Sequence, residues 1–280
     1  MQNQKRKSPK NNTTYKTPTP ISSTSWGKVA EWYDEYLQDE DTYQAKVISP
    51  NLMRILRIEE QAVGTKILEL GCGQGYFVEQ VLSHAKQTVN VEGVDVGKEL
   101  LDIAKNKNQK AVFTHTPASN LGHIQDHSVD IVYSVLALQN MDNFEDVIRE
   151  VKRVLKPHGR FVAVLNHPTF RIPKQSDWYF SNDRKAQGRV VYTYMSSQKI
   201  GIDMHPGQTV LGAKKQETFS FHHPLQFYTK VFAKYNLGIS RIEEWISHKT
   251  SEEGPKKRAE DSARKEIPLF MCLEIRSFIA

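Results

Sequence analysis

The sequence predicts an α/β protein built around a doubly wound parallel sheet. Short apolar runs, typical of buried strands, alternate with amphipathic helical stretches from about residue 66 to residue 166. A glycine-rich turn follows the first of these runs, and an acidic residue ends the second. Strands separated by helices favour parallel pairing, with helices on both faces of the sheet. At 280 residues, of which 39% are hydrophobic, the chain is long enough to bury a sizeable core.

The expected elements follow in order along the chain. Two helices come first, over 26–38 and about 42–57, and the former is rich in aromatic residues. The expected strands are 66–70, 89–95, 111–116, 129–135 and 160–166, and the helices between them are 76–86, 99–107 and 144–155. Pro157 and Gly159 form a stop signal after the last of these helices. Later elements are a strand at 218–222, a helix at 224–235, and strands at 239–246 and 268–275.

Composition divides the chain into a tail and a folded domain. Residues 1–24 contain five lysine or arginine residues and no acidic residue, which predicts a disordered basic tail. Residues 25–280 are expected to form one domain, in which 167–215 form a substrate lid or insertion without a clean period. The net charge of +6 lies largely in the tail, so the rest of the chain is nearly neutral. This disfavours a nucleic-acid partner, although a weak RNA-tethering role for the tail stays open.

Cysteine usage and hydropathy bear on the compartment. Cys72 and Cys272 are far apart and lie in no CxxC pattern, which predicts neither a disulfide framework nor a zinc site. No apolar run approaches the roughly 18 residues that a membrane span requires. Residues 1–20 also lack the apolar core of a secretory signal. We therefore expect a cytoplasmic protein without a membrane span.

The glycine-rich turn is the most informative motif. Gly71, Gly73 and Gly75 follow the strand at 66–70 and precede a helix. A dinucleotide site has a glycine at the sixth position of this motif, where this chain has Tyr76. Asp95 ends the next strand, where an acidic side chain can accept hydrogen bonds from both ribose hydroxyls of an adenosine nucleoside. The combination favours a nucleoside cofactor without a pyrophosphate.

These segments resemble class I S-adenosylmethionine (SAM)-dependent methyltransferases of the type 11 group. The resemblance rests on ILELGCGQGYF, VEGVDVGKELLDIAK, SVDIVYSVLALQNMDN and VKRVLKPHGRFVAVLNHP, and extends well over residues 26–166 and loosely beyond. The group includes the ubiquinone and menaquinone C-methyltransferases. The resemblance implies a Rossmann-like seven-stranded sheet in the order 3-2-1-4-5-7-6 with the last strand antiparallel. It also implies SAM as cofactor and S-adenosylhomocysteine as its product.

The resemblance also implies which residues bind the cofactor. They are Tyr33, Glu69, Gly71, Gly73, Gly75, Asp95, Val96, Ala118, Ser119, Val135 and Gln139. Glu69 and the glycines would line the methionine end, Asp95 would take the ribose, and Val96 would pack on the adenine. Pro117 stands where many relatives have an aspartate, which leaves recognition of the adenine amine open. Structural roles also remain open for Glu69, Tyr33 and Gln139.

The acceptor side is less defined. The segment 136–139 has no proline of the kind used in nucleobase amine methylation, and neither cysteine suits cytosine C5 methylation. Metal-dependent catechol methylation needs a cluster of carboxylates after the fourth and fifth strands. Here the fifth strand ends at Asn166 and is followed by His167 and Pro168, so no metal is expected. His167, Arg171 and His222 are the candidate catalytic residues, as bases or as a partner for a substrate carboxylate or phosphate. Structural hydrogen bonds or salt bridges would account for each equally well.

Four functions are compatible with these observations. A methyltransferase acting on a small molecule accounts for most of them. A tRNA or rRNA methyltransferase, a SAM-binding protein without catalysis and a nicotinamide-dependent oxidoreductase are the alternatives. Tyr76 disfavours the last of these. The acceptor atom and the oligomeric state do not follow from the sequence.

Overall fold

A seven-stranded sheet forms the centre of the computed structural model, which describes residues 26–204 and 217–278. Its strands are β1 (Lys66–Leu70), β2 (Asn90–Asp95), β3 (Val112–His115), β4 (Val129–Val135), β5 (Leu155–Asn166), β10 (Leu237–Trp245) and β11 (Phe270–Ser277). Their order is β3-β2-β1-β4-β5-β11-β10, and β11 runs antiparallel to both of its neighbours. This confirms the predicted sheet order and the antiparallel last strand. The expected basic tail lies outside the described residues.

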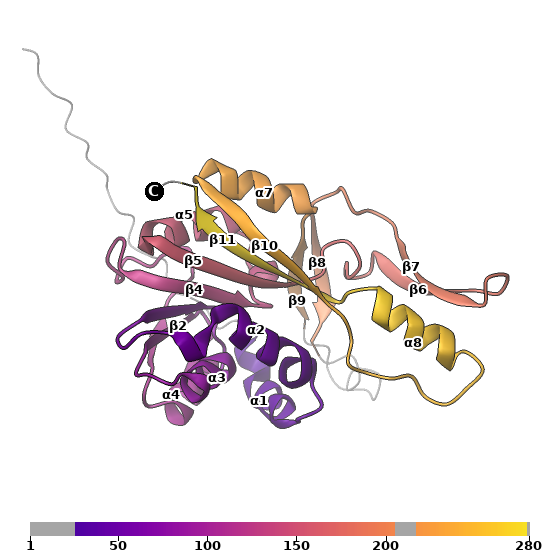
Figure 1. Ribbon diagram of the computed structural model, residues 1–280, viewed down its shortest axis with the longest axis horizontal. Coiled ribbons are helices and arrows are strands. Elements are labelled where there is room, and N and C mark those ends of the chain that lie inside the picture. The colour runs from indigo at the N-terminus through magenta and orange to yellow at the C-terminus, as the bar shows by residue number, and fades with distance from the viewer. Residues whose placement is uncertain (1–25, 205–216, 279–280) are drawn as a thin grey trace, which may run out of the picture.

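Helices cover both faces of this sheet (Figure 1). The helices are α1 (Ala30–Gln38), α2 (Ser49–Leu56), α3 (Tyr76–His84), α4 (Lys98–Lys107), α5 (Phe144–Val154), α7 (Leu225–Lys234) and α8 (Lys257–Glu266). In Figure 1, α1 to α4 lie on one side and α5 and α7 on the other. Two buried hydrophobic clusters correspond to these faces, one around Phe77 and Phe113 and one around Phe144 and Phe161. The doubly wound arrangement thus follows from apolar strands that need cover on both sides.

Two helices begin or end differently from the expectation. The helix predicted over 42–57 consists of a π-helical turn, Gln44–Ile48, followed by α2, in which Pro50 occupies the tolerated first turn. The helix α5 ends at Val154, directly before β5. Pro157 and Gly159, the predicted stop signal, therefore lie within β5. The pairing of β4 with β5 is irregular there, because Val129 pairs with Leu155 whereas Ile131 pairs with Arg160.

The segment after β5 forms two antiparallel hairpin pairs outside the central sheet. The strands β6 (Ser176–Ser181) and β7 (Ala186–Val191) pair with each other and project from the body (Figure 1). The strand predicted at 218–222 is present as β9 (Glu217–His222), but it pairs with β8 (Gln198–Asp203). The polar stretch before the last strand contains α8, which lies beside β7.

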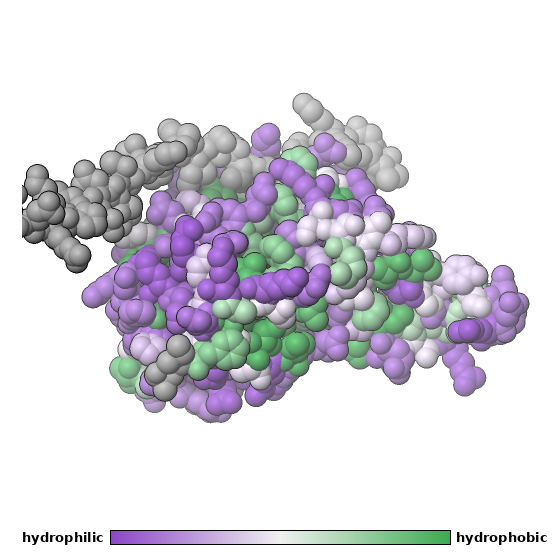
Figure 2. Space-filling view, turned by 90° about the horizontal axis from the view of Figure 1, so that it is seen from above, coloured by the Kyte–Doolittle hydropathy of each residue, from purple (hydrophilic) through white to green (hydrophobic). Residues whose placement is uncertain are grey.

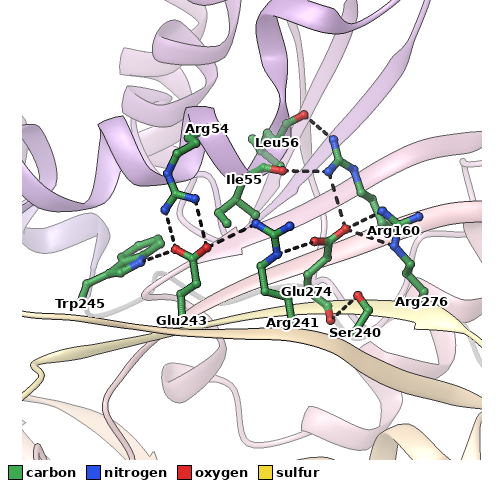
Figure 3. A network of polar contacts seen from close by, with 10 residues as sticks. All are labelled: Arg54, Ile55, Leu56, Arg160, Ser240, Arg241, Glu243, Trp245, Glu274 and Arg276. Atoms are coloured by element: carbon green, nitrogen blue, oxygen red, sulfur yellow. Dashed lines mark hydrogen bonds and ion pairs between the residues drawn. The ribbon is translucent and has the colours of Figure 1, made fainter.

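A charged network joins α2 to the far half of the sheet (Figure 3). Glu274, on β11, is 4% exposed and lies 2.6 Å from Arg276 and 3.7 Å from Arg160. Arg160 also donates hydrogen bonds to the backbone carbonyls of Ile55 and Leu56 at the end of α2. Arg160 therefore carries a buried charge whose partners come from two distant segments.

The face of the molecule seen in Figure 2 is mixed in character. Figure 2 shows the face seen from above, where hydrophobic residues gather in patches among hydrophilic ones. Within the described ranges, no helix combines the length and the apolarity that crossing a bilayer would take.

Glu274→Gln is expected to lower the free energy of unfolding by about 3–5 kcal/mol, the usual cost of leaving the partner of a buried ion pair uncompensated. Urea unfolding followed by circular dichroism would measure the change. Glu253→Gln is a matched control, because Glu253 pairs with Lys257 while its side chain is 88% exposed. An equal shift for both variants would contradict the structural importance of the buried network.

Candidate functional site

The turn between β1 and α3 holds three glycines in the left-handed region. Gly71, Gly73 and Gly75 have φ values of 70°, 53° and 80°. A residue other than glycine adopts such positive φ values at a cost of about 1–2 kcal/mol. The amides of Gly71 and Cys72 both donate to the carbonyl of Val94, at 2.8 and 3.1 Å, so the turn is fixed to the end of β2.

The three glycines face different surroundings. A Cβ on Gly71 would lie 2.5 Å from the Cβ of Ala137, and one on Gly75 would lie 3.2 Å from Phe113. A Cβ on Gly73 would have no neighbour within 4 Å. Gly71 and Gly75 therefore allow close packing of the turn, whereas Gly73 leaves open space above the backbone.

Asp95 joins this turn to the loop after β2. Its Oδ2 accepts a hydrogen bond from the amide of Gly73 at 2.8 Å, and its Oδ1 accepts one from the amide of Gly97 at 2.7 Å. Burial raises the pKa of this carboxyl, and the two amide bonds partly oppose the effect. Each carboxylate oxygen keeps a second lone pair that can accept a ligand hydroxyl.

A cavity of about 320 Å³ opens beside Asp95, a volume at the lower end of the range of about 300–1,000 Å³ for small-molecule sites. It lies at the carboxyl edge of the parallel strands, where open α/β sheets place their ligands. Seven of the predicted cofactor-binding residues line it: Tyr33, Gly71, Gly73, Asp95, Val96, Ala118 and Val135. The structure thus brings the glycine turn, the ribose-binding candidate and the loops after β3 and β4 to one cavity.

The other four predicted cofactor-binding residues lie behind or beside the lining. Glu69 is 1% exposed and accepts a hydrogen bond from the Tyr133 hydroxyl at 2.9 Å. Burial raises the pKa of Glu69 well above its usual range, and the Asp95 charge raises it further. Gln139 accepts a hydrogen bond from the Asn166 amide at 3.2 Å, and so links the turn after β4 to the end of β5. Gly75 packs as described above, and Ser119 follows Ala118 beyond the lining.

Sequence reasoning missed several residues of this cavity. They are Trp26, Val94, Leu100, Thr116, Leu136, Ala137, Asn140, Met141, Asp142 and Asn143, in addition to Pro117, for which the sequence left the binding role open. Most of them follow β4, and the end of that strand is the feature of the sequence that could have located them. Leu136 has a φ of 51°, an unusual value for a bulky side chain, and backbone strain of this kind is concentrated at functional sites.

Aromatic residues before the sheet cover one side of the cavity. The rings of Trp26 and Tyr33 meet edge to face with centroids 5.6 Å apart, and Tyr33 stacks on Tyr36 at 6.4 Å. Burial raises the pKa of Tyr33 to about 12, against the opposing effect of a hydrogen bond with Gln44. The Tyr33 hydroxyl therefore stays protonated at neutral pH.

The two candidate histidines have structural partners. The Nδ1 of His167 accepts the amide of Thr169 at 3.2 Å, and its Nε2 donates to the Glu244 carboxylate at 2.7 Å. The Nε2 of His222 donates to the carbonyl of Tyr194 at 2.8 Å. Burial lowers the pKa of both rings. Neither histidine lines the cavity beside Asp95, so the geometry gives no support to either as a general base there.

Arg171 and three aromatic residues of the expected lid, Trp178, Tyr179 and Tyr192, lie apart from the cavity beside Asp95. The Arg171 guanidinium stacks over the ring of Phe270, 5.1 Å from its centroid, and lines a separate pocket with Trp178. Tyr179 and Tyr192 are about 60% exposed, so they wall no enclosed site in this conformation. Within 26–204 and 217–278, no three His, Cys, Asp or Glu side chains are grouped so that they would hold a metal ion.

Comparison with known proteins finds similarity in the central part of the chain. Residues 68–163 match the type 11 methyltransferase domain model. This match begins in β1, includes the glycine turn, Asp95 and the end of β4, and stops within β5. It therefore contains the central strands of the sheet and most of the cofactor cavity.

Two curated relatives and one solved structure extend the match. Demethylmenaquinone methyltransferase of Lactococcus lactis is 31% identical over 162 residues, which are 52% of this chain and 62% of the relative. Malonyl-[acyl-carrier protein] O-methyltransferase of Marinomonas sp. is 27% identical over 185 residues, 64% of this chain and 66% of the relative. The chain therefore spans less than two thirds of each. An S-adenosylmethionine-dependent methyltransferase from Mesorhizobium loti shares the fold, with a TM-score of 0.59 and 21% identity over 80% of this chain and 96% of that one.

Gly73→Ala is expected to lower the free energy of unfolding by only about 1–2 kcal/mol, since the methyl group meets no neighbour and the cost is that of a left-handed alanine. The same change should strongly weaken binding of S-adenosylhomocysteine, because the methyl group occupies the open space above the turn. Gly71→Ala is the comparison, because its methyl group would also collide with Ala137. Denaturant unfolding and calorimetric titration of both variants would measure the two effects. We expect Gly73→Ala to lose more S-adenosylhomocysteine affinity, relative to its loss of stability, than Gly71→Ala does. Unchanged affinity in Gly73→Ala would contradict the placement of the ligand.

Proposed function

We propose that the protein transfers a methyl group from SAM to a small molecule, because residues 68–163 match the type 11 methyltransferase domain model and the fold is that of SAM-dependent methyltransferases. The observation that carries this proposal is the cavity beside the glycine turn, with the Asp95 carboxylate in its wall. A cytoplasmic location belongs to the same proposal.

The residues of the cavity fit the cofactor. Asp95 offers free lone pairs to two ribose hydroxyls, and Val96 and Ala118 provide apolar walls for the adenine. The charge of Asp95 makes it more costly to ionise the buried carboxyl of Glu69. A cationic ligand nearby would lower that cost. SAM carries a sulfonium and an ammonium group, which suits this negative potential.

Two buried amide atoms support the placement of the methionine end. Gln44 Oε1 and Gln74 Nε2 have no hydrogen-bond partner among the described residues. A buried polar atom without a partner costs about 1–3 kcal/mol. Gln74 lies within the glycine turn, and Gln44 interacts with Tyr33, which lines the cavity. An acceptor and a donor here would suit an ammonium and a carboxylate.

SAM, when bound, supplies a methyl group on an activated sulfonium. The contribution of this chain is to position the acceptor and to exclude water, which Trp26 and Tyr33 favour by covering the cavity. The titratable side chains in the described lining are Tyr33, Asp95 and Asp142, and none is a histidine. This favours an acceptor atom that is nucleophilic without a strong base.

A small-molecule acceptor is favoured by the relatives and by charge. The named substrates of the Lactococcus lactis and Marinomonas relatives are a quinone and an acyl group on a carrier protein, respectively. Outside residues 1–24 the chain carries nearly equal numbers of basic and acidic residues, which disfavours an RNA acceptor. Removal of residues 1–24 would test that alternative directly, because RNA binding through the tail would be lost with them.

Calorimetric titration with SAM, S-adenosylhomocysteine and NAD tests the cofactor. We expect micromolar binding of the first two ligands and none of NAD. If SAM and S-adenosylhomocysteine fail to bind to the folded protein, the proposed function is wrong. Binding together with methyl transfer to a candidate acceptor would separate an enzyme from a SAM-binding protein without catalysis.

Asp95→Ala is expected to weaken S-adenosylhomocysteine binding by about 1–3 kcal/mol at neutral pH, the scale of hydrogen bonds to a charged acceptor. In the wild type the pKa of Asp95 is raised, and ribose hydroxyls favour its ionised form. Affinity should therefore be complete above that raised pKa and fall as the pH drops through it. Asp95→Asn should flatten this dependence, whereas an unchanged acid decline would assign it to another group such as Glu69.

A further inference from the structure

A second pocket, separate from the cofactor cavity, is lined by three arginines. Arg171, Arg189 and Arg264 surround a volume of about 190 Å³ together with Tyr43, Trp178 and Ser247. The pocket lies among the segment after β5, the hairpin of β6 and β7, and α8. No aspartate or glutamate of the described residues lines it. Three cations thus face one small space without an acidic side chain in its wall.

Two of these arginines are held in place by other groups. Arg189 donates to the carbonyl of Phe170 at 2.8 Å and to the Ser176 hydroxyl at 2.8 Å, and lies over the ring of Trp178. Arg264 donates to the Ser251 hydroxyl at 3.1 Å. Both guanidinium groups are therefore oriented before any ligand arrives.

The charges of these two arginines are also partly balanced. The carboxylate of Asp177 acts on Arg189, although burial is the larger effect and lowers its pKa. Asp261 lies near Arg264 on the same helix, and its pKa is lowered first by the Ser251 amide and also by Arg264. Neither acid lines the pocket.

Arg171 has no such compensation. Within the described part of the chain no carboxylate pairs with it, and its contact is the ring of Phe270. Burial lowers its pKa and Arg189 lowers it further, and the effects of Tyr43 and Tyr36, each smaller than that of burial, oppose this only in part. A buried charge is costly unless it is paired, so an arginine kept in this position suggests a ligand anion. The planar fork of guanidinium matches the oxygen atoms of carboxylate and phosphate.

We propose that the pocket of Arg171, Arg189 and Arg264 binds an anionic group, a carboxylate or a phosphate, of the methyl acceptor. The identity of the ligand as the acceptor rests on the proposed function, whereas anion binding itself does not. A volume of about 190 Å³ suits a small charged group with the adjoining part of a molecule. Trp178 and Tyr43 provide apolar surface for that adjoining part.

The connection to the cofactor cavity runs through two sets of contacts. Tyr33 lines the cofactor cavity and stacks on Tyr36, which lies close enough to Arg171 to raise its pKa. Phe270, beneath Arg171, pairs in the sheet with Asn166, whose amide binds Gln139 after β4. Arg171 is therefore linked through Tyr36 to Tyr33, which lines the cavity beside Asp95.

Calorimetric titration of the full chain with malonate and with inorganic pyrophosphate, each with and without saturating S-adenosylhomocysteine, tests the proposal. We expect one of the two probes to bind, and the stronger probe identifies the carboxylate or the phosphate class. Arg171→Met should weaken that binding about tenfold or more, the scale of hydrogen bonds to a charged group, while S-adenosylhomocysteine affinity stays unchanged. Arg264→Gln should give a smaller loss and serves as a second variant.

Arg184→Gln is the matched control, because Arg184 lies exposed in the turn between β6 and β7. Thermal unfolding separates ligand binding from a structural role: the midpoint of ligand-free Arg171→Met should not fall, since an uncompensated charge is removed. The proposal is overturned if neither probe binds a protein that binds S-adenosylhomocysteine, or if Arg184→Gln loses as much affinity as Arg171→Met. Probe binding without S-adenosylhomocysteine binding would instead overturn the proposed function and leave the anion site standing.

Discussion

The hydrogen bonds from the amides of Gly73 and Gly97 to the Asp95 carboxylate tie the turn after β1 to the loop after β2. Both loops leave the same edge of the sheet, so the carboxylate fixes the position of Gly73 while Asp95 itself lines the cavity. Its burial has a cost that the two amides only partly offset. A ligand hydroxyl that donates to the same oxygens would therefore offset more of the cost of burying the carboxylate. The glycines allow this arrangement, since the turn can approach β2 and β4 only without side chains.

A second set of polar contacts fixes the helices that precede the sheet. Arg160 binds the carbonyls that end α2, and Arg54 of the same helix pairs with Glu243 on β10 (Figure 3). The helix α1 is joined to α4 by the ion pair of Asp34 and Lys107. The helix α1, which carries Tyr33, is thereby held against α4. The position of Tyr33 beside the cavity therefore depends on a contact that lies away from it.

The sequence predicted the elements that bury apolar faces and left open those that do not. Strands such as β4, buried along nearly its whole length, show a continuous apolar run, and the glycines with Asp95 mark the turn. The strand β6 is mostly exposed, and α8 buries only Ala263, so neither carries an apolar period that sequence analysis can detect. His167 illustrates a different limit, because its two partners come from distant strands and adjacent amides that a local pattern does not reveal. The strained backbone of Leu136 is equally invisible, since it arises from tertiary packing.

The two halves of the site therefore follow different physical rules. The cofactor side is built from strand ends in a close-packed sheet, where a change of one methyl group is felt, so its geometry is tightly constrained. The proposed acceptor side is built from the segment after β5 and from β6, β7 and α8, and the latter three bury few side chains fully. Substitutions there change charge and shape at little cost to the core. Arg189 and Arg264 come from these weakly constrained segments, so their convergence with Arg171 is better explained by the anion that we propose they bind than by a stabilising role.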